Sequence, residues 1–122
     1  MVGSEQFVPG WIPTLLTPAA PKDLIDEVTE IMSDFHPAGT RVMINAFGKA
    51  DYRPVLPTIT IPTLLLYGDT DRRSPLYVAR DLHDRIAGST LVVLPNVGHA
   101  GNMEAPAAFN TAVRTFLHAI GV

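Results

Sequence analysis

The spacing of apolar residues predicts two helices in the first half of the chain. From Pro21 to His36, apolar side chains recur every three or four positions, at Leu24, Val28, Ile31, Met32 and Phe35. A second helical stripe lies between Pro37 and Gly48, at Val42, Met43, Ala46 and Phe47. Prolines suit the first turn of a helix and a glycine suits its end. We expect these two helices to pair as a hairpin.

Two segments lack a helical or strand period and are broken by proline. Residues 1–20 contain Pro9, Pro13 and Pro18, and residues 51–62 contain Pro54, Pro57 and Pro62. Clustered prolines favour extended backbone. The first segment is therefore predicted to be an extended lead-in and the second a semi-rigid connector. The boundary between two units is placed here, with residues 1–50 forming a helical part and residues 51–122 a second part.

The remaining sequence predicts the order strand, helix, strand, helix. Thr63–Tyr67 is a continuous apolar run, typical of a strand buried on both faces of a parallel sheet. In the next helix Ser74 is the expected cap and Gly88 follows the end, whereas the last helix begins at Pro106. Leu91–Leu94 is the second strand. The fold class is α/β, with two parallel strands whose open edges indicate a sheet that is incomplete within this sequence.

Each predicted strand is followed by a loop with an ionisable residue. Asp69 and Asp71 follow the first strand, and His99 follows the second after a loop that is expected to run from Pro95 to Met103. Functional groups collect at the carboxyl ends of parallel strands. We therefore expect these side chains to meet at one edge of the sheet.

These two loops resemble the α/β-hydrolase family. The segment from Ile61 to Asp71, which contains a Gly-x-x-Asp turn and is followed by Ser74-Pro75, is similar to the strand and turn that bear the acid of the family's catalytic triad. Asn96-Val-Gly-His99, continued by Glu104, Pro106, Phe109 and Asn110, is similar to the family's histidine loop and last helix. The acid also precedes the histidine, as it does in the family.

The resemblance implies that Asp71 is the triad acid and that His99 is the general base. A histidine takes the proton of the nucleophile, and a carboxylate fixes its tautomer and stabilises the imidazolium that forms. Asp69 is the rival acid and is interpreted as a turn residue. Without the resemblance, Asp71 is most simply a turn or capping aspartate and His99 an ordinary loop histidine.

Residues 1–50 resemble the end of the helical cap that such enzymes insert before the acid-bearing strand. In that position Trp11, Met32, Met43 and Phe47 would line an acyl or aromatic pocket. The simpler interpretation, that these side chains only pack helices together, is favoured by the apolar stripes alone.

The sequence lacks the family's nucleophile motif. The family carries a serine in Gly-x-Ser-x-Gly on a strand-to-helix elbow, and none of the serines has this context: Ser4, Ser33, Ser74 and Ser89. We therefore expect a truncated, split or fragmentary gene product that is catalytically inactive alone.

Composition narrows the classes of partner. A net charge of −3, with no cluster of basic residues, argues against nucleic acid. There is no cysteine, and His36, His83 and His118 have no partner at metal-ligand spacing, so neither a metal nor another cofactor is expected. No apolar run is long enough to span a membrane, and a cytoplasmic location is expected. Arg72 and Arg73 are interpreted as solvated, with steering of an anionic substrate as the alternative.

Two functions are compatible with these observations. In the first, the chain is the C-terminal part of a hydrolase acting on an ester, lactone or similar carbonyl bond, with Asp71 and His99 serving a serine supplied elsewhere. In the second, the chain is an inactive relic or binding module that self-associates or attaches to another protein. The missing nucleophile, the open sheet edges and the 47% content of hydrophobic residues favour this alternative.

Overall fold

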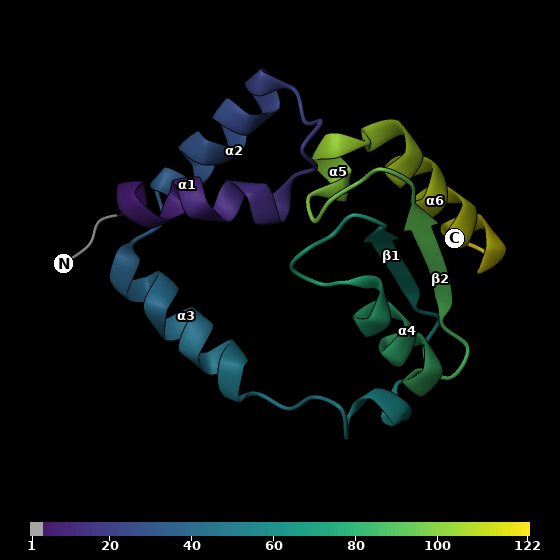
Figure 1. Cartoon of the computed structure of the whole chain (residues 1–122). Coiled ribbons are helices and arrows are strands. Elements are labelled where there is room, and N and C mark those ends of the chain that lie inside the picture. Colours follow the sequence, from purple (N-terminus) through teal and green to yellow (C-terminus); the bar gives the residue numbers. More distant parts are fainter. Residues whose placement is uncertain (1–3) are drawn as a thin grey trace.

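The structure is a computed structural model that describes residues 4–122 (Figure 1). Three helices come first: α1 (Ser4–Leu15), α2 (Lys22–Ser33) and α3 (Pro37–Lys49). A connector with one 3-10 turn, η1 (Leu56–Thr58), leads to the α/β part. This part consists of β1 (Leu64–Gly68), α4 (Leu76–Arg85), β2 (Thr90–Leu94), α5 (Gly101–Glu104) and α6 (Pro106–Ala119). None of the helices in the described part is long and apolar enough to cross a membrane.

The predicted α/β order is confirmed. Strands β1 and β2 are parallel, with Leu64 opposite Thr90 and Gly68 opposite Leu94. Helices α4 and α6 both contact the two strands, and Figure 1 shows them on either side of the sheet. The residues of β1 before Gly68 are only half-buried, contrary to the prediction of a strand covered on both faces. The reason is that the sheet has two strands in residues 4–122, so each strand keeps one unpaired edge.

The prediction of an extended lead-in over residues 1–20 is wrong for most of its length. Helix α1 occupies residues 4–15, with Pro9 and Pro13 inside it; residues 1–3 lie outside the described residues. Val8, Ile12 and Leu16 recur every four residues and are buried, while the two prolines are exposed. Burial stabilises by about 1.5–3 kcal/mol for each aliphatic side chain, comparable with the roughly 3 kcal/mol that each interior proline costs. Tertiary packing therefore decides in favour of the helix.

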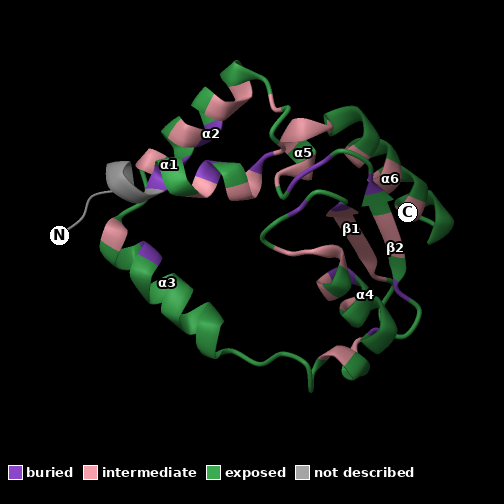
Figure 2. Cartoon of the chain, in the orientation of Figure 1, coloured by how far each residue is buried: buried purple, intermediate pink, exposed green. Residues whose placement is uncertain are grey.

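Helix α2 packs against α1 and not against α3. Its buried residues Val28 and Met32 join the α1 residues in one apolar cluster (Figure 2). Helix α3 extends away from this pair and is exposed along most of its length, so the predicted hairpin is not formed. The apolar stripe of α3 is correspondingly open to solvent, with Val42 70% and Phe47 66% exposed.

Two local predictions also need correction. Ser74 does not cap α4, because its hydroxyl donates to the Tyr67 hydroxyl at 3.3 Å and the helix begins at Leu76. The loop expected from Pro95 to Met103 contains the short helix α5, which begins at Gly101. Gly88 does follow α4, in the left-handed conformation, with φ of 76°.

Candidate active site

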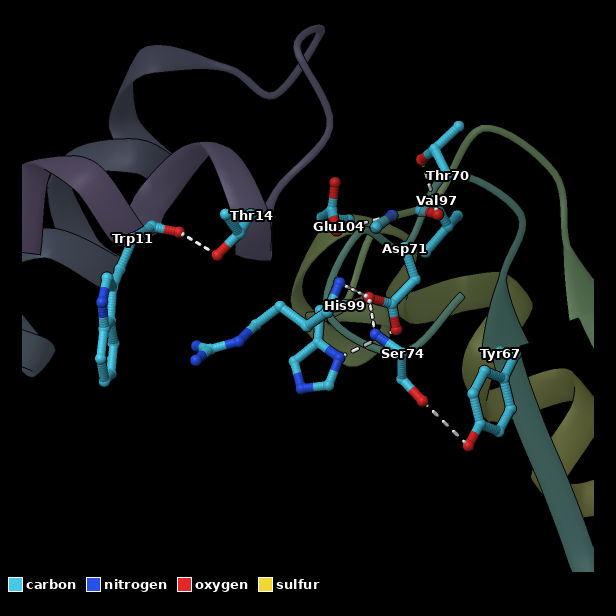
Figure 3. Close-up of polar contacts among 11 residues, drawn as sticks. Trp11, Thr14, Tyr67, Thr70, Asp71, Ser74, Val97, His99 and Glu104 are labelled. Carbon is cyan, nitrogen blue, oxygen red and sulfur yellow. Dashed lines mark hydrogen bonds and ion pairs between the residues drawn. The ribbon is translucent and has the colours of Figure 1, made fainter. Parts of the chain in front are cut away.

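Asp71 and His99 meet at the carboxyl edge of the two-stranded sheet (Figure 3). The Oδ2 atom of Asp71 lies 2.9 Å from Nδ1 of His99, a hydrogen-bond distance between residues 28 apart in sequence. The Asp71 side chain is 5% exposed and that of His99 is 44% exposed. A buried carboxylate thus holds one nitrogen of an imidazole ring that remains partly accessible.

Backbone N–H groups fix the orientation of the Asp71 carboxylate. Its Oδ1 atom accepts hydrogen bonds from the N–H groups of Arg73 at 2.8 Å and Ser74 at 2.9 Å. The loop that follows β1 therefore satisfies one carboxylate oxygen and leaves the other for His99. These two bonds satisfy Oδ1 and hold the carboxylate in its buried position.

Asp69, the rival acid, does not reach His99. Its side chain is exposed, and its Oδ1 atom accepts only a long contact of 3.4 Å from the N–H of Val97. Its own N–H donates to the carbonyl of Leu94 at 3.0 Å. Asp69 is therefore a turn residue that ties the two loops together, and only Asp71 pairs with the histidine.

The loops after β1 and β2 approach each other so closely that position 68 must be glycine. A Cβ atom at Gly68 would collide with the carbonyl oxygens of Val97 and Gly98. Thr70 reinforces the approach, since both its N–H and its hydroxyl donate to the Val97 carbonyl, at 3.0 Å and 2.8 Å. The close approach of the two loops thus explains why the Gly-x-x-Asp turn begins with glycine.

Asn96 provides the turn that leads into the histidine loop. Its φ of 57° is positive, and asparagine is one of the few residues that tolerate this conformation.

Glu104 connects the histidine loop to the end of α1. Its Oε1 atom accepts a hydrogen bond from the N–H of Gly98 at 2.9 Å, and its Oε2 atom accepts one from the N–H of Thr17 at 2.7 Å. The resemblance included Glu104 without a role for it. The sequence marks Glu104 by its place five residues after His99 and by the Glu-x-Pro context. Its contact with Thr17, 87 residues away, leaves no signal in the sequence.

Among the described residues, two cavities border His99. The smaller, of about 280 Å³, is lined by Asp71, Ser74 and His99 together with residues of β1, β2, α5 and α6. The larger, of about 420 Å³, lies between His99 and the three N-terminal helices. Its lining includes Trp11, Met32, Met43 and Phe47, so these four residues share one cavity (Figure 3 shows Trp11 and His99). Met32 is also buried in the helical cluster, and packing accounts for part of its role.

The remaining predicted residues lie apart from the Asp71–His99 pair. His83 is on α4, where its Nδ1 atom lies 2.7 Å from the hydroxyl of Ser89, and His36 and His118 are exposed. No group of three potential metal ligands occurs among residues 4–122 whose side chains are described. Arg72 borders a third cavity beside α1, whereas Arg73 lines the larger cavity with His99. The sequence did not predict this separation of the two arginines.

The fold and the paired loops define an α/β protein with an acid–histidine pair at the carboxyl edge of its sheet. Residues 3–112 match the model of the alpha/beta hydrolase family. The chain belongs to this family.

Named relatives agree with this assignment. The chain is 32% identical over 84 residues to pimeloyl-[acyl-carrier protein] methyl ester esterase of Neisseria meningitidis, covering 69% of this chain and 27% of that protein. It is 30% identical over 111 residues to 3-oxoadipate enol-lactonase 2 of Acinetobacter baylyi, covering 91% of this chain and 39% of the lactonase.

A solved structure is similar over nearly the whole chain. The esterase EaEST from Exiguobacterium antarcticum superposes with a TM-score of 0.86 at 25% identity, over 94% of this chain and 44% of the esterase. The chain therefore spans less than half the length of each of these three proteins.

Proposed function

We propose that Asp71 and His99 are the acid and the general base of a serine-type hydrolase acting on an ester, lactone or similar carbonyl bond. The observation that carries the proposal is the 2.9 Å contact between Asp71 Oδ2 and His99 Nδ1, with the carboxylate buried and the imidazole accessible. Two relatives named for an ester and a lactone substrate support the class of bond.

In this proposal each nitrogen of His99 has a separate task. Asp71 Oδ2 accepts a hydrogen bond from the N–H at Nδ1 of His99, so the proton stays on Nδ1 and Nε2 is left as the proton acceptor. When a nucleophile hydroxyl attacks the carbonyl carbon, Nε2 removes its proton and Asp71 stabilises the imidazolium. The same proton then passes from Nε2 to the leaving oxygen as the carbon–oxygen bond of the ester breaks.

The nucleophile in this proposal is a serine outside the 122 residues. No serine of the chain has the Gly-x-Ser-x-Gly context, and the chain alone is expected to be inactive. Residues 1–50 serve as the cap over the site, and residues 51–122 belong to the catalytic core. The contacts of Glu104 and Leu15 between these two parts support a cap that is fixed to the histidine loop.

The test is to produce this chain together with the polypeptide encoded directly upstream of its first codon, as one chain or as two, and to follow hydrolysis of p-nitrophenyl acetate. Hydrolysis is expected, and His99→Ala or Asp71→Asn should lower it by on the order of 10³-fold or more. His118→Ala and Asp69→Asn are the matched controls and should leave it nearly unchanged. Absence of hydrolysis, or full activity of His99→Ala, would refute the proposal.

A second candidate is a binding module that associates through exposed apolar surface. The apolar side chains of α3, with Val42 and Phe47 mostly exposed, favour it, as do the unpaired edges of β1 and β2. Light scattering after gel filtration separates the candidates: a monomer across the micromolar range argues against self-association, and a defined dimer supports it. Val42→Glu on α3 should dissociate such a dimer, whereas Arg41→Glu should not.

A further inference from the structure

The guanidinium group of Arg73 lies over the ring of Trp11. The guanidinium carbon lies 4.7 Å from the ring centroid, within the range of a cation–π contact. Trp11 belongs to α1 and Arg73 to the loop after β1, so the contact bridges the helical and α/β parts. Both residues line the 420 Å³ cavity together with His99.

Apart from Arg73 and His99, the described lining of this cavity is mostly apolar. Met32, Phe35, Met43 and Phe47 contribute sulfur and aromatic surface, and Arg73 is the only residue with a permanent charge among the described lining residues. No carboxylate among the described side chains lies within ion-pair distance of Arg73. The cavity thus combines an apolar wall, one cation that has no counter-ion among the described side chains, and the accessible ring of His99.

This combination suits a particular kind of ligand. Arginine presents a planar fork of N–H donors that matches a carboxylate with two parallel hydrogen bonds. The Trp11 ring lies beside the guanidinium and holds it at the cavity. A cavity of 420 Å³ is within the range of small-molecule sites, and the apolar wall would bury methylene groups between the two ends of the ligand.

We propose that this cavity binds an ester or lactone that also carries a free carboxylate, with the carboxylate on Arg73, the aliphatic chain along the methionine and phenylalanine side chains, and the cleavable bond at His99. The assignment of the cleavable bond rests on the proposed function. The selection of a carboxylate by Arg73 is a property of binding and does not require the nucleophile.

Fluorescence of Trp11, the single tryptophan of the chain, reports binding at the cavity. The probes are the monomethyl esters of adipic, suberic and sebacic acid, compared with the neutral dimethyl ester of the same acid. At least one monoester should bind roughly tenfold or more tightly than its diester, because a hydrogen-bonded ion pair is lost in the diester. Equal affinity of every monoester and its diester, or binding by neither, would overturn the proposal.

Arg72 is a matched control, since it is the neighbouring arginine and borders a different cavity. Arg73→Met should abolish the preference for the monoester, Arg73→Lys should retain part of it, and Arg72→Met should leave it intact. Calorimetric titration provides the affinities of the Arg73 variants, because changing Arg73 also changes the surroundings of the Trp11 fluorophore. If Arg73→Met does not fold, Arg73→Lys carries the test, and an undiminished preference in that variant would contradict the carboxylate contact.

The two proposals fail in different ways. Preferential binding of a monoester without hydrolysis by the extended protein would remove the proposed function and leave the carboxylate site. Hydrolysis with equal affinity for monoester and diester would leave the function and remove the carboxylate site.

Discussion

The carbonyl oxygen of Leu15, at the end of α1, accepts a hydrogen bond from the backbone N–H of His99 at 2.7 Å. The next N–H, of Ala100, donates to the same oxygen at 3.1 Å. The last carbonyls of a helix have no partner within the helix, so these bonds satisfy an acceptor that would otherwise remain open. The position of His99 therefore depends on a helix 84 residues earlier as well as on its own loop.

Glu104→Ala is expected to destabilise the fold and loosen the histidine loop. The change removes the acceptor for the N–H groups of Gly98 and Thr17, and each unsatisfied group costs about 1–3 kcal/mol when buried. Because Glu104 is half-buried, we expect the free energy of unfolding, measured in urea, to fall by about 1–2 kcal/mol in total. Glu104→Gln keeps one acceptor oxygen, so this variant should lose less stability than Glu104→Ala. Glu27→Ala, on the exposed face of α2, is the control, and an equal loss there would contradict the role of Glu104.

Gly68→Ala is expected to destabilise the chain by about 1–3 kcal/mol, the range of an overpacked site. The added methyl group would collide with the carbonyl oxygens of Val97 and Gly98, so the two loops must separate. Gly39→Ala in α3 is the matched control, because nothing lies within 4 Å of the added atom, and it should be neutral or stabilising. Thermal unfolding distinguishes the two. Equal melting temperatures for the two variants would show that the loops are not in close contact.

Arg53 lowers the pKa of Asp51 to about 2 from 3.8, chiefly through the hydrogen bonds of its guanidinium at 2.8 Å. Because the pKa is lower in the folded chain, the contribution of this pair to stability is present above pH 3.8 and is lost as the pH falls from 3.8 towards 2. An NMR titration of the Asp51 carboxyl carbon should show the low midpoint. Arg53→Gln should raise it towards 3.8, whereas Arg85→Gln should change it little; identical midpoints in both variants would contradict this geometry.

Local sequence patterns predicted the α/β order well. A short continuous apolar run such as Thr63–Tyr67, bounded by proline and glycine, has few alternatives to a strand. The pairing of the two loops also followed from the sequence, because parallel strands bring their carboxyl ends to one edge. The choice of Asp71 over Asp69 came from the resemblance to the α/β-hydrolase family, because the strand order alone brings both side chains to this edge.

The errors arose where local signals and tertiary packing disagree. Prolines at positions 9 and 13 argued against α1, although Val8, Ile12 and Leu16 had helical spacing and their burial prevailed. The apolar stripe of α3 argued for packing against α2, yet that helix extends away and its stripe is exposed. Contacts between distant residues, such as Glu104 with Thr17 and Arg73 with Trp11, leave no periodic pattern in the sequence.

The most direct measurement on the chain itself is the tautomer of His99, read from long-range proton–nitrogen NMR correlations at a pH where the ring is neutral. We expect a proton on Nδ1 and a bare Nε2, as a general base requires, with this preference lost in Asp71→Asn and retained in Asp69→Asn. A proton on Nε2 in the unmodified chain, or an unchanged tautomer in Asp71→Asn, would contradict the assignment of Asp71 and His99 as the catalytic acid and base.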